Sequence, residues 1–69
     1  MDEFKLAGQE YIELNNLLKL MGLIDSGGMA KIAIAEGRVK VDGAVELRRR
    51  CKIRTGQKVE YEGRTIIVL

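Results

Sequence analysis

Histidine, tryptophan and proline are absent from this sequence of 69 residues, which contains one cysteine and three aromatic side chains. Without histidine, no Ser-His or Cys-His pair is available to activate a nucleophile. One cysteine allows no internal disulfide, which favours a reducing compartment, and no cysteine- or histidine-rich zinc site. Carboxylates at metal-ligand spacing and a glycine-rich phosphate loop are missing too. We therefore expect no catalysis, no metal and no cofactor.

Long apolar runs are also missing, since no stretch approaches the roughly 18 residues that a membrane span requires. The segment Met1–Phe4 is acidic, so we expect no signal or transit peptide there. The length predicts a single domain, residues 1–69, with a small core. The composition, 46% hydrophobic and 32% charged, is that of an ordinary globular protein. Together these features favour a monomeric domain of the cytoplasm.

Positive charge is concentrated in the second half of the chain. Residues 1–36 carry three basic and six acidic side chains, whereas residues 37–69 carry nine basic and four acidic ones. The densest cluster lies between Glu46 and Arg54. If this segment is an extended strand, one face carries Arg48, Arg50, Lys52 and Arg54, and the other carries Leu47, Cys51 and Ile53. Such a row of cations suits nucleic-acid phosphates, although charge runs also keep edge strands soluble.

Apolar spacing predicts two helices before the basic half. The first lies within residues 11–21, where Leu14, Leu17, Leu18 and Met21 share one face, and Gly22 is placed to end it. The second runs from a cap at Asp25 or Ser26 to about Glu36 and ends at Gly37. Its core-facing residues are expected to be Ala30, Ala33 and Ile34, flanked by Met29 or Ile32.

The rest of the chain alternates as strands. A short first strand is expected at residues 4–6, and later strands at 38–41, 44–46, 59–61 and 64–69. Asp42-Gly43 is a strong hairpin signal, and Glu62-Gly63 predicts another turn. The basic segment is expected to be a further strand. The predicted fold is therefore α+β, with a helix-loop-helix packed on a small antiparallel sheet.

Ser26-Gly27-Gly28 stands at the entrance of the second predicted helix. Helix N-termini present unpaired N–H groups, so this entrance suits a phosphate, and Lys31 lies one turn further on. A plain capping function for Ser26 fits the same residues equally well. Both interpretations stay open from these residues alone.

Cys51 and the aromatic residues each allow a simple structural interpretation. Neighbouring arginines could depress the pKa of Cys51 and make it a nucleophile, but a small core side chain on a strand is favoured. Phe4, Tyr11 and Tyr61 fit core or half-buried positions. The chain thus lacks evident platforms for splayed bases, so contacts to phosphates and to the shape of a folded nucleic acid are expected instead of base stacking.

Several segments combine into a known pattern. They are Leu17–Gly22, Ser26–Lys31, Gly37–Gly43, and Glu46 with Arg48, Arg50 and Lys52. Together they resemble the S-four (S4) RNA-binding domain, first recognised in ribosomal small-subunit protein four. That domain also occurs in pseudouridine synthases, tyrosyl-tRNA synthetases and a ribosome-associated heat-shock protein. The resemblance covers roughly residues 14–63, and residues 30–53 are similar to a small stand-alone bacterial form of the domain.

The resemblance implies that a helix-loop-helix and the following hairpin, an αL-type motif, form an RNA-binding surface. The RNA-facing residues that it implies are Ser26, Gly27, Gly28, Lys31, Lys40, Arg48, Arg49, Arg50 and Lys52. Arg38 and Arg54 are expected at the rim. Many family members carry a basic residue directly after the helix-entry serine, where this chain has Gly27-Gly28. A phosphate contact there would come from backbone N–H groups.

The expected function is non-catalytic binding of structured RNA, ribosomal or transfer RNA, in ribosome association, RNA modification or translation. The preference for RNA over DNA comes from the resemblance only. With about 4–6 phosphates neutralised, log K should fall against log salt with a slope of about −3 to −5. Two alternatives are a protein-interaction module, whose basic row binds an acidic partner, and an enzyme that uses Cys51.

Overall fold

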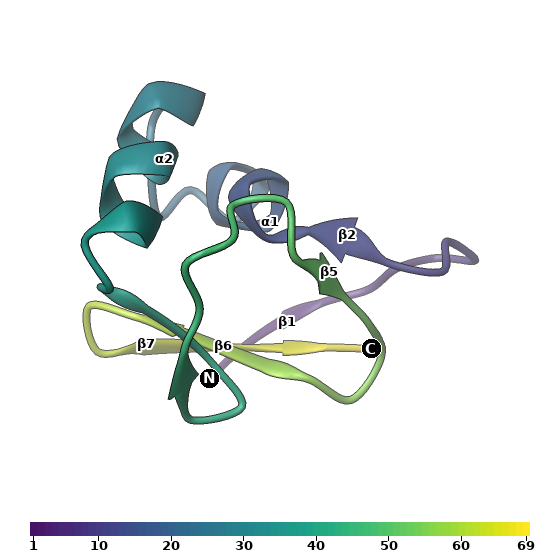
Figure 1. Cartoon of the computed structure of the whole chain (residues 1–69). Helices are drawn as coiled ribbons and strands as arrows, with labels where there is room; N and C mark the ends of the chain where they lie inside the picture. Colours follow the sequence, from purple (N-terminus) through teal and green to yellow (C-terminus); the bar gives the residue numbers. More distant parts are fainter.

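The computed structural model describes residues 1–69 as two helices and seven short strands (Figure 1). The helices are α1 (Leu14–Leu20) and α2 (Gly27–Ala35). The strands are β1 (Asp2–Phe4), β2 (Ile12–Glu13), β3 (Val39–Val41), β4 (Ala44–Val45), β5 (Lys52–Ile53), β6 (Lys58–Tyr61) and β7 (Arg64–Val68). Neither helix has the length and apolar composition of a membrane span.

Five of the strands form one sheet in the order β1-β7-β6-β3-β4. The predicted α+β class is confirmed, but the sheet is mixed, because β1 runs parallel to β7 with Phe4 opposite Val68. A parallel neighbour requires a long connection, and here both helices lie between β1 and β7 in the chain. The antiparallel prediction therefore holds for β3, β4, β6 and β7 and is wrong for β1.

A second, two-stranded ribbon joins β2 to β5, with Ile12 opposite Ile53 and Glu13 opposite Lys52. Sequence patterning missed β2, since two residues show no alternation. The first helix was expected within residues 11–21, which is too early, because Ile12 and Glu13 belong to this ribbon and α1 begins at Leu14. The ribbon lies beside α1, over the same side of the main sheet as the helices (Figure 1).

The core lies between the helix pair and one face of the five-stranded sheet. The sheet contributes alternating side chains such as Val39, Val59 and Ile66, all fully buried. The helices contribute Leu14, Leu17, Leu18, Ala30, Ala33 and Ile34, which confirms the core positions expected from the apolar spacing. Met29 and Ile32 remain more than half exposed at the flank. Sixteen residues are buried in all, and none of them is charged.

The ends of the elements follow the local signals in the sequence. Ser26 is the N-cap of α2, and its Oγ accepts a hydrogen bond from the Met29 N–H at 3.3 Å. Gly22 ends α1 with a φ of 73°, and the next N–H, that of Leu23, returns to the Leu18 carbonyl at 3.1 Å. Asp42 and Gly43 have φ values of 51° and 84°, as the tight β3–β4 hairpin requires.

Candidate nucleic-acid interface

The basic segment forms a turn, not the expected strand. The Cys51 N–H donates to the Arg48 carbonyl at 3.1 Å, and this bond places Arg49 and Arg50 at the corner of the turn. Only Lys52–Ile53 pair as a strand, β5. Leu47, expected to face the core, is 61% exposed. The predicted single row of Arg48, Arg50, Lys52 and Arg54 along one strand is therefore wrong. We call residues 48–51 the basic turn.

The start of α1 holds the basic turn in place. The first N–H groups of a helix lack partners within the helix, and α1 has no side-chain cap. The Leu14 N–H donates to the Cys51 carbonyl and the Asn15 N–H to the Arg49 carbonyl, both at 2.9 Å. The carbonyls of the turn thus accept hydrogen bonds from the helix N–H groups that have no acceptor within α1. These long-range bonds explain why the segment bends here instead of continuing β4.

Glu46 holds the side chain of Arg48 against the turn. Its carboxylate accepts hydrogen bonds from the Arg48 backbone N–H and Nε, both at 2.9 Å, and from Nη2 at 3.1 Å. Mainly because of the bond from the Arg48 side chain, the pKa of Glu46 falls from 4.5 to about 2. The same pairing raises the pKa of Arg48. The charge of Arg48 is thus already balanced within the chain.

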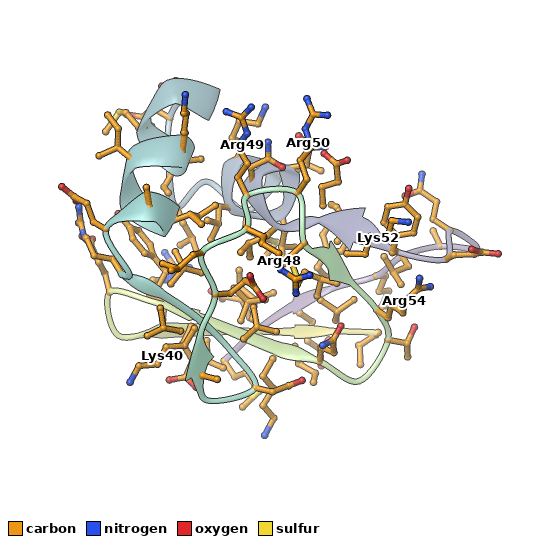
Figure 2. The ribbon with its side chains drawn as sticks, in the orientation of Figure 1. Lys40, Arg48, Arg49, Arg50, Lys52 and Arg54 are labelled. Carbon is orange, nitrogen blue, oxygen red and sulfur yellow. The ribbon has the colours of Figure 1, made fainter.

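Arg49 and Arg50 are the free cations of the basic turn. Both side chains are exposed, and neither takes part in a salt bridge. Figure 2 shows them extending outward from the corner of the turn, while Arg48 points the opposite way, below the turn and beside β5. Their direction follows from the backbone bonds of the turn to α1, so no long flexible loop carries them. Two unpaired guanidinium groups on a fixed turn favour an anionic ligand.

Lys52 and Arg54 lie next to the turn, beside Tyr11. The Lys52 Nζ lies 4.9 Å from the centre of the Tyr11 ring, and the Arg54 Cζ lies 5.6 Å from it. A cavity of about 350 Å³ is lined by Arg48, Arg50, Cys51 and Lys52. Glu46 balances the charge of Arg48, but Arg50 and Lys52 form no salt bridge, so the cavity suits an anion.

The entrance of α2 faces the same end of the molecule as the outward arginines (Figure 2). Ser26 is confirmed as a cap, while the N–H groups of Gly27 and Gly28 make no hydrogen bond within the chain. Lys31 is exposed on the first turns of α2. Lys19 of α1 is a further cation here, because its Nζ lies 3.8 Å from where a Cβ on Gly27 would stand. Sequence reasoning missed Lys19, whose only signal was its place near a helix C-terminus.

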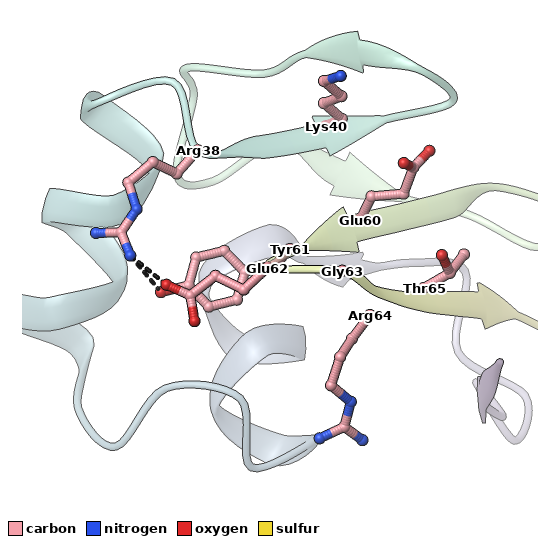
Figure 3. Close-up of a pocket in the computed structure, with 8 residues that line it drawn as sticks. All are labelled: Arg38, Lys40, Glu60, Tyr61, Glu62, Gly63, Arg64 and Thr65. Atoms are coloured by element: carbon pink, nitrogen blue, oxygen red, sulfur yellow. Dashed lines mark hydrogen bonds and ion pairs between the residues drawn. The ribbon is translucent and has the colours of Figure 1, made fainter.

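Lys40 and Arg38 do not join these residues. Val39 and Val41 are buried under the helices, so strand alternation turns Lys40 to the opposite face of the sheet. There it lines a cavity of about 230 Å³ together with Arg38, Glu60, Glu62 and Arg64 (Figure 3). Because acidic and basic side chains mix there, the cavity has no preference for anions. Arg38 is paired with Glu36 and Glu62, and it contacts the Tyr61 hydroxyl at 3.3 Å.

Cys51 has the properties of a packing residue. It is half-buried against the core, and burial is the largest cause that raises the pKa of its thiol. Glu46 raises it further, and Arg48, whose Nη2 lies 3.7 Å from the sulfur, only partly offsets this. The alternative of a depressed Cys51 pKa is therefore wrong, and the favoured interpretation of Cys51 as a packing residue agrees with its place against the core. A thiol that stays protonated at neutral pH is a poor nucleophile.

Comparison with known proteins identifies the family of this chain. The family model of the S4 domain matches residues 4–69. YbcJ of Escherichia coli (strain K12), provisionally named an RNA-binding protein, is 55% identical over 69 residues, which cover all of this chain and 99% of YbcJ. RlbA of Bacillus subtilis (strain 168), provisionally named a ribosome maturation protein, is 44% identical over 54 residues, which cover 78% of this chain and 76% of RlbA.

A solved structure agrees with the fold. The solution structure of E. coli YbcJ matches with a TM-score of 0.77 at 55% sequence identity. The match covers 100% of this chain and 87% of that one, and the YbcJ structure is described as revealing an αL motif involved in RNA binding.

Proposed function

The chain belongs to the S4 domain family, and from this we propose that it is a non-catalytic protein that binds structured RNA, ribosomal or transfer RNA, through the phosphate backbone. The YbcJ and RlbA names favour RNA as the ligand and an association with the ribosome. We further propose that it acts as a cytoplasmic monomer. One observation carries the proposal: Arg49 and Arg50 are unpaired cations on a turn fixed to α1.

The proposed surface differs in part from the set expected from the sequence. Its members are Ser26, Gly27, Gly28, Lys31, Arg49, Arg50 and Lys52, with Lys19 and Arg54 beside them. Arg48 acts indirectly in this proposal, because its pair with Glu46 shapes the turn. Lys40 is left out, since it points from the opposite face of the sheet.

At the entrance of α2, the two unpaired N–H groups of Gly27 and Gly28 favour a backbone contact to phosphate. The nearby Lys19 Nζ supplies a positive charge where the family often has a basic side chain after the serine. We therefore expect the α2 entrance and the basic turn to contact neighbouring parts of one RNA backbone. With four to six cations in contact, log K should fall against log salt with a slope of about −3 to −5.

The test is ultraviolet crosslinking in cells with sequencing of the bound RNA, for the wild type and for an Arg49→Ala, Arg50→Ala variant. The matched control is a Lys40→Ala, Lys58→Ala variant, which removes the same charge from exposed positions on the other face of the sheet. We expect one structured RNA to be enriched with the wild type and the control, and lost with the arginine variant.

Equal recovery of RNA with both variants would contradict the proposed surface. The alternative of an acidic protein partner predicts a different result, because a partner bound directly to the basic turn stays bound after ribonuclease treatment. A protein partner that stays bound after this treatment, without any crosslinked RNA, would replace the RNA proposal.

In vitro, the Arg49→Ala, Arg50→Ala variant should reduce the magnitude of the slope of log K against log salt by about 1.4–1.8, since each phosphate contact contributes about 0.7–0.9.

A further inference from the structure

We propose that Tyr11, with Lys52 and Arg54, forms a site for one unpaired nucleotide, whose base stacks on the Tyr11 ring and whose phosphate contacts the two cations. The inference rests on the proposed binding of RNA. It departs from the sequence-based expectation of no base stacking, because the structure places two cations at the Tyr11 ring. It implies that the preferred RNA presents a bulged or looped nucleotide next to the segment held by the basic turn.

The β2–β5 ribbon brings the three side chains together on its outer face. Ile12 and Ile53, opposite each other in the ribbon, are 7% and 0% exposed and point into the core. Alternation therefore places Tyr11, Lys52 and Arg54 on the outer face, where the ring is half-buried. The distances of 4.9 Å and 5.6 Å from the ring centre place both cations at the aromatic surface.

A cavity beside the ring has the chemistry of a base-binding pocket. It measures about 530 Å³ and is lined by Gln9, Glu10, Tyr11, Ile12, Glu13 and Asn16. The side-chain amides of Gln9 and Asn16 make no hydrogen bond within the chain, and carboxylates accept bonds from the N–H groups of a base. The same carboxylates repel phosphate. The base is thus expected at the side of the Tyr11 ring that faces the cavity, and the phosphate is expected beside Lys52 and Arg54.

Stacking is strong enough to displace a cation from the ring. An exposed cation–π contact strengthens an interaction by only about two- to fivefold. A base stacked on an aromatic side chain contributes about five- to 150-fold in affinity. The displaced cation loses its contact with the ring but gains a new partner, the phosphate of the bound nucleotide.

The experiment compares two probes, a single-stranded RNA octamer with one 2-aminopurine and the duplex of the same octamer. The proteins are the wild type, Tyr11→Phe and Tyr11→Leu, with thermal unfolding to show that each variant is folded. We expect the wild type and Tyr11→Phe to quench the 2-aminopurine fluorescence of the single strand. Tyr11→Leu should bind the single strand at least fivefold more weakly and should change duplex binding less than twofold.

Two outcomes would overturn the inference while RNA binding stands. One is unchanged single-strand affinity in Tyr11→Leu, and the other is an equal loss for both probes, which would mean that Tyr11 only orients Lys52 and Arg54. If the folded wild type binds neither probe at low salt, the nucleotide site is overturned as well, and the crosslinking experiment above decides separately whether the RNA proposal stands.

Discussion

The pair formed by Glu46 and Arg48 gives a prediction that links pH, stability and the basic turn. Replacing Glu46 by Gln keeps the shape of the side chain but removes the charge that the Arg48 guanidinium contacts. The lowered pKa of Glu46, about 2 instead of 4.5, would add at most about 3.4 kcal/mol to the free energy of unfolding. Because 77% of the Arg48 side chain is exposed, water screens the pair. We therefore expect Glu46→Gln to lower the free energy of unfolding by roughly 1 kcal/mol.

The expected effect on stability is a Tm about 4–8 °C lower at pH 7, since 1 kcal/mol shifts the Tm of a domain of this size by that amount. The pH dependence has a defined direction. The folded-state pKa of Glu46 lies below its ordinary value, so the stabilisation is present above pH 4.5 and is lost as the pH falls toward 2. The Gln variant lacks this part of the acid sensitivity.

The assay is thermal unfolding followed by circular dichroism between pH 2 and pH 7, combined with an NMR titration of the Glu46 carboxyl. The control is Glu36→Gln, which removes one partner of the exposed pair with Arg38 and should lower the Tm less than Glu46→Gln does. A Glu46 pKa near 4.5, or equal Tm values for the wild type and Glu46→Gln, would refute the reasoning.

Three further predictions follow from other parts of the molecule. Leu17→Ala should lower the free energy of unfolding by about 2–5 kcal/mol in urea titrations, because the side chain is fully buried, and a loss below 1 kcal/mol would contradict its place in the core. Lys19→Ala should reduce the salt slope of RNA binding by about 0.7–0.9 without altering the Tm, and an unchanged slope would exclude Lys19 from the surface. Cys51 should react more slowly with iodoacetamide at pH 7 in the folded protein than in urea, because burial raises its thiol pKa; faster labelling of the folded protein would argue for an activated thiol.

Local features of the structure could be read from the sequence because each depends on neighbours in the chain. The spacing of Leu14, Leu17 and Leu18 predicted the buried face of α1. A cap for α2 was predicted at Asp25 or Ser26, and Ser26 forms it. The Asp42-Gly43 pair predicted a hairpin whose two residues both have positive φ. The resemblance to the S4 domain, which rests on such local segments together, is confirmed by the family model.

The arrangement of the cations, by contrast, was decided by contacts between distant residues. Arg48, Arg49 and Arg50 form a turn because two backbone carbonyls of this segment complete the first turn of α1, which lacks a cap of its own. The resemblance to the S4 domain grouped Lys40 with these arginines. Because Val39 and Val41 on either side of it are buried, its side chain lies on the other face of the sheet.

The sequence by itself therefore determined the helices, the caps, the tight hairpin and the presence of a basic surface, since these follow from periodicity and from local backbone preferences. Only the tertiary structure decided that β1 lies parallel to β7, that Tyr11 lies against Lys52 and Arg54, and that the Arg49 and Cys51 carbonyls accept hydrogen bonds from the first N–H groups of α1. The physical reason is that unpaired N–H groups, carboxylates and guanidinium groups find partners by proximity in space, which no local pattern encodes.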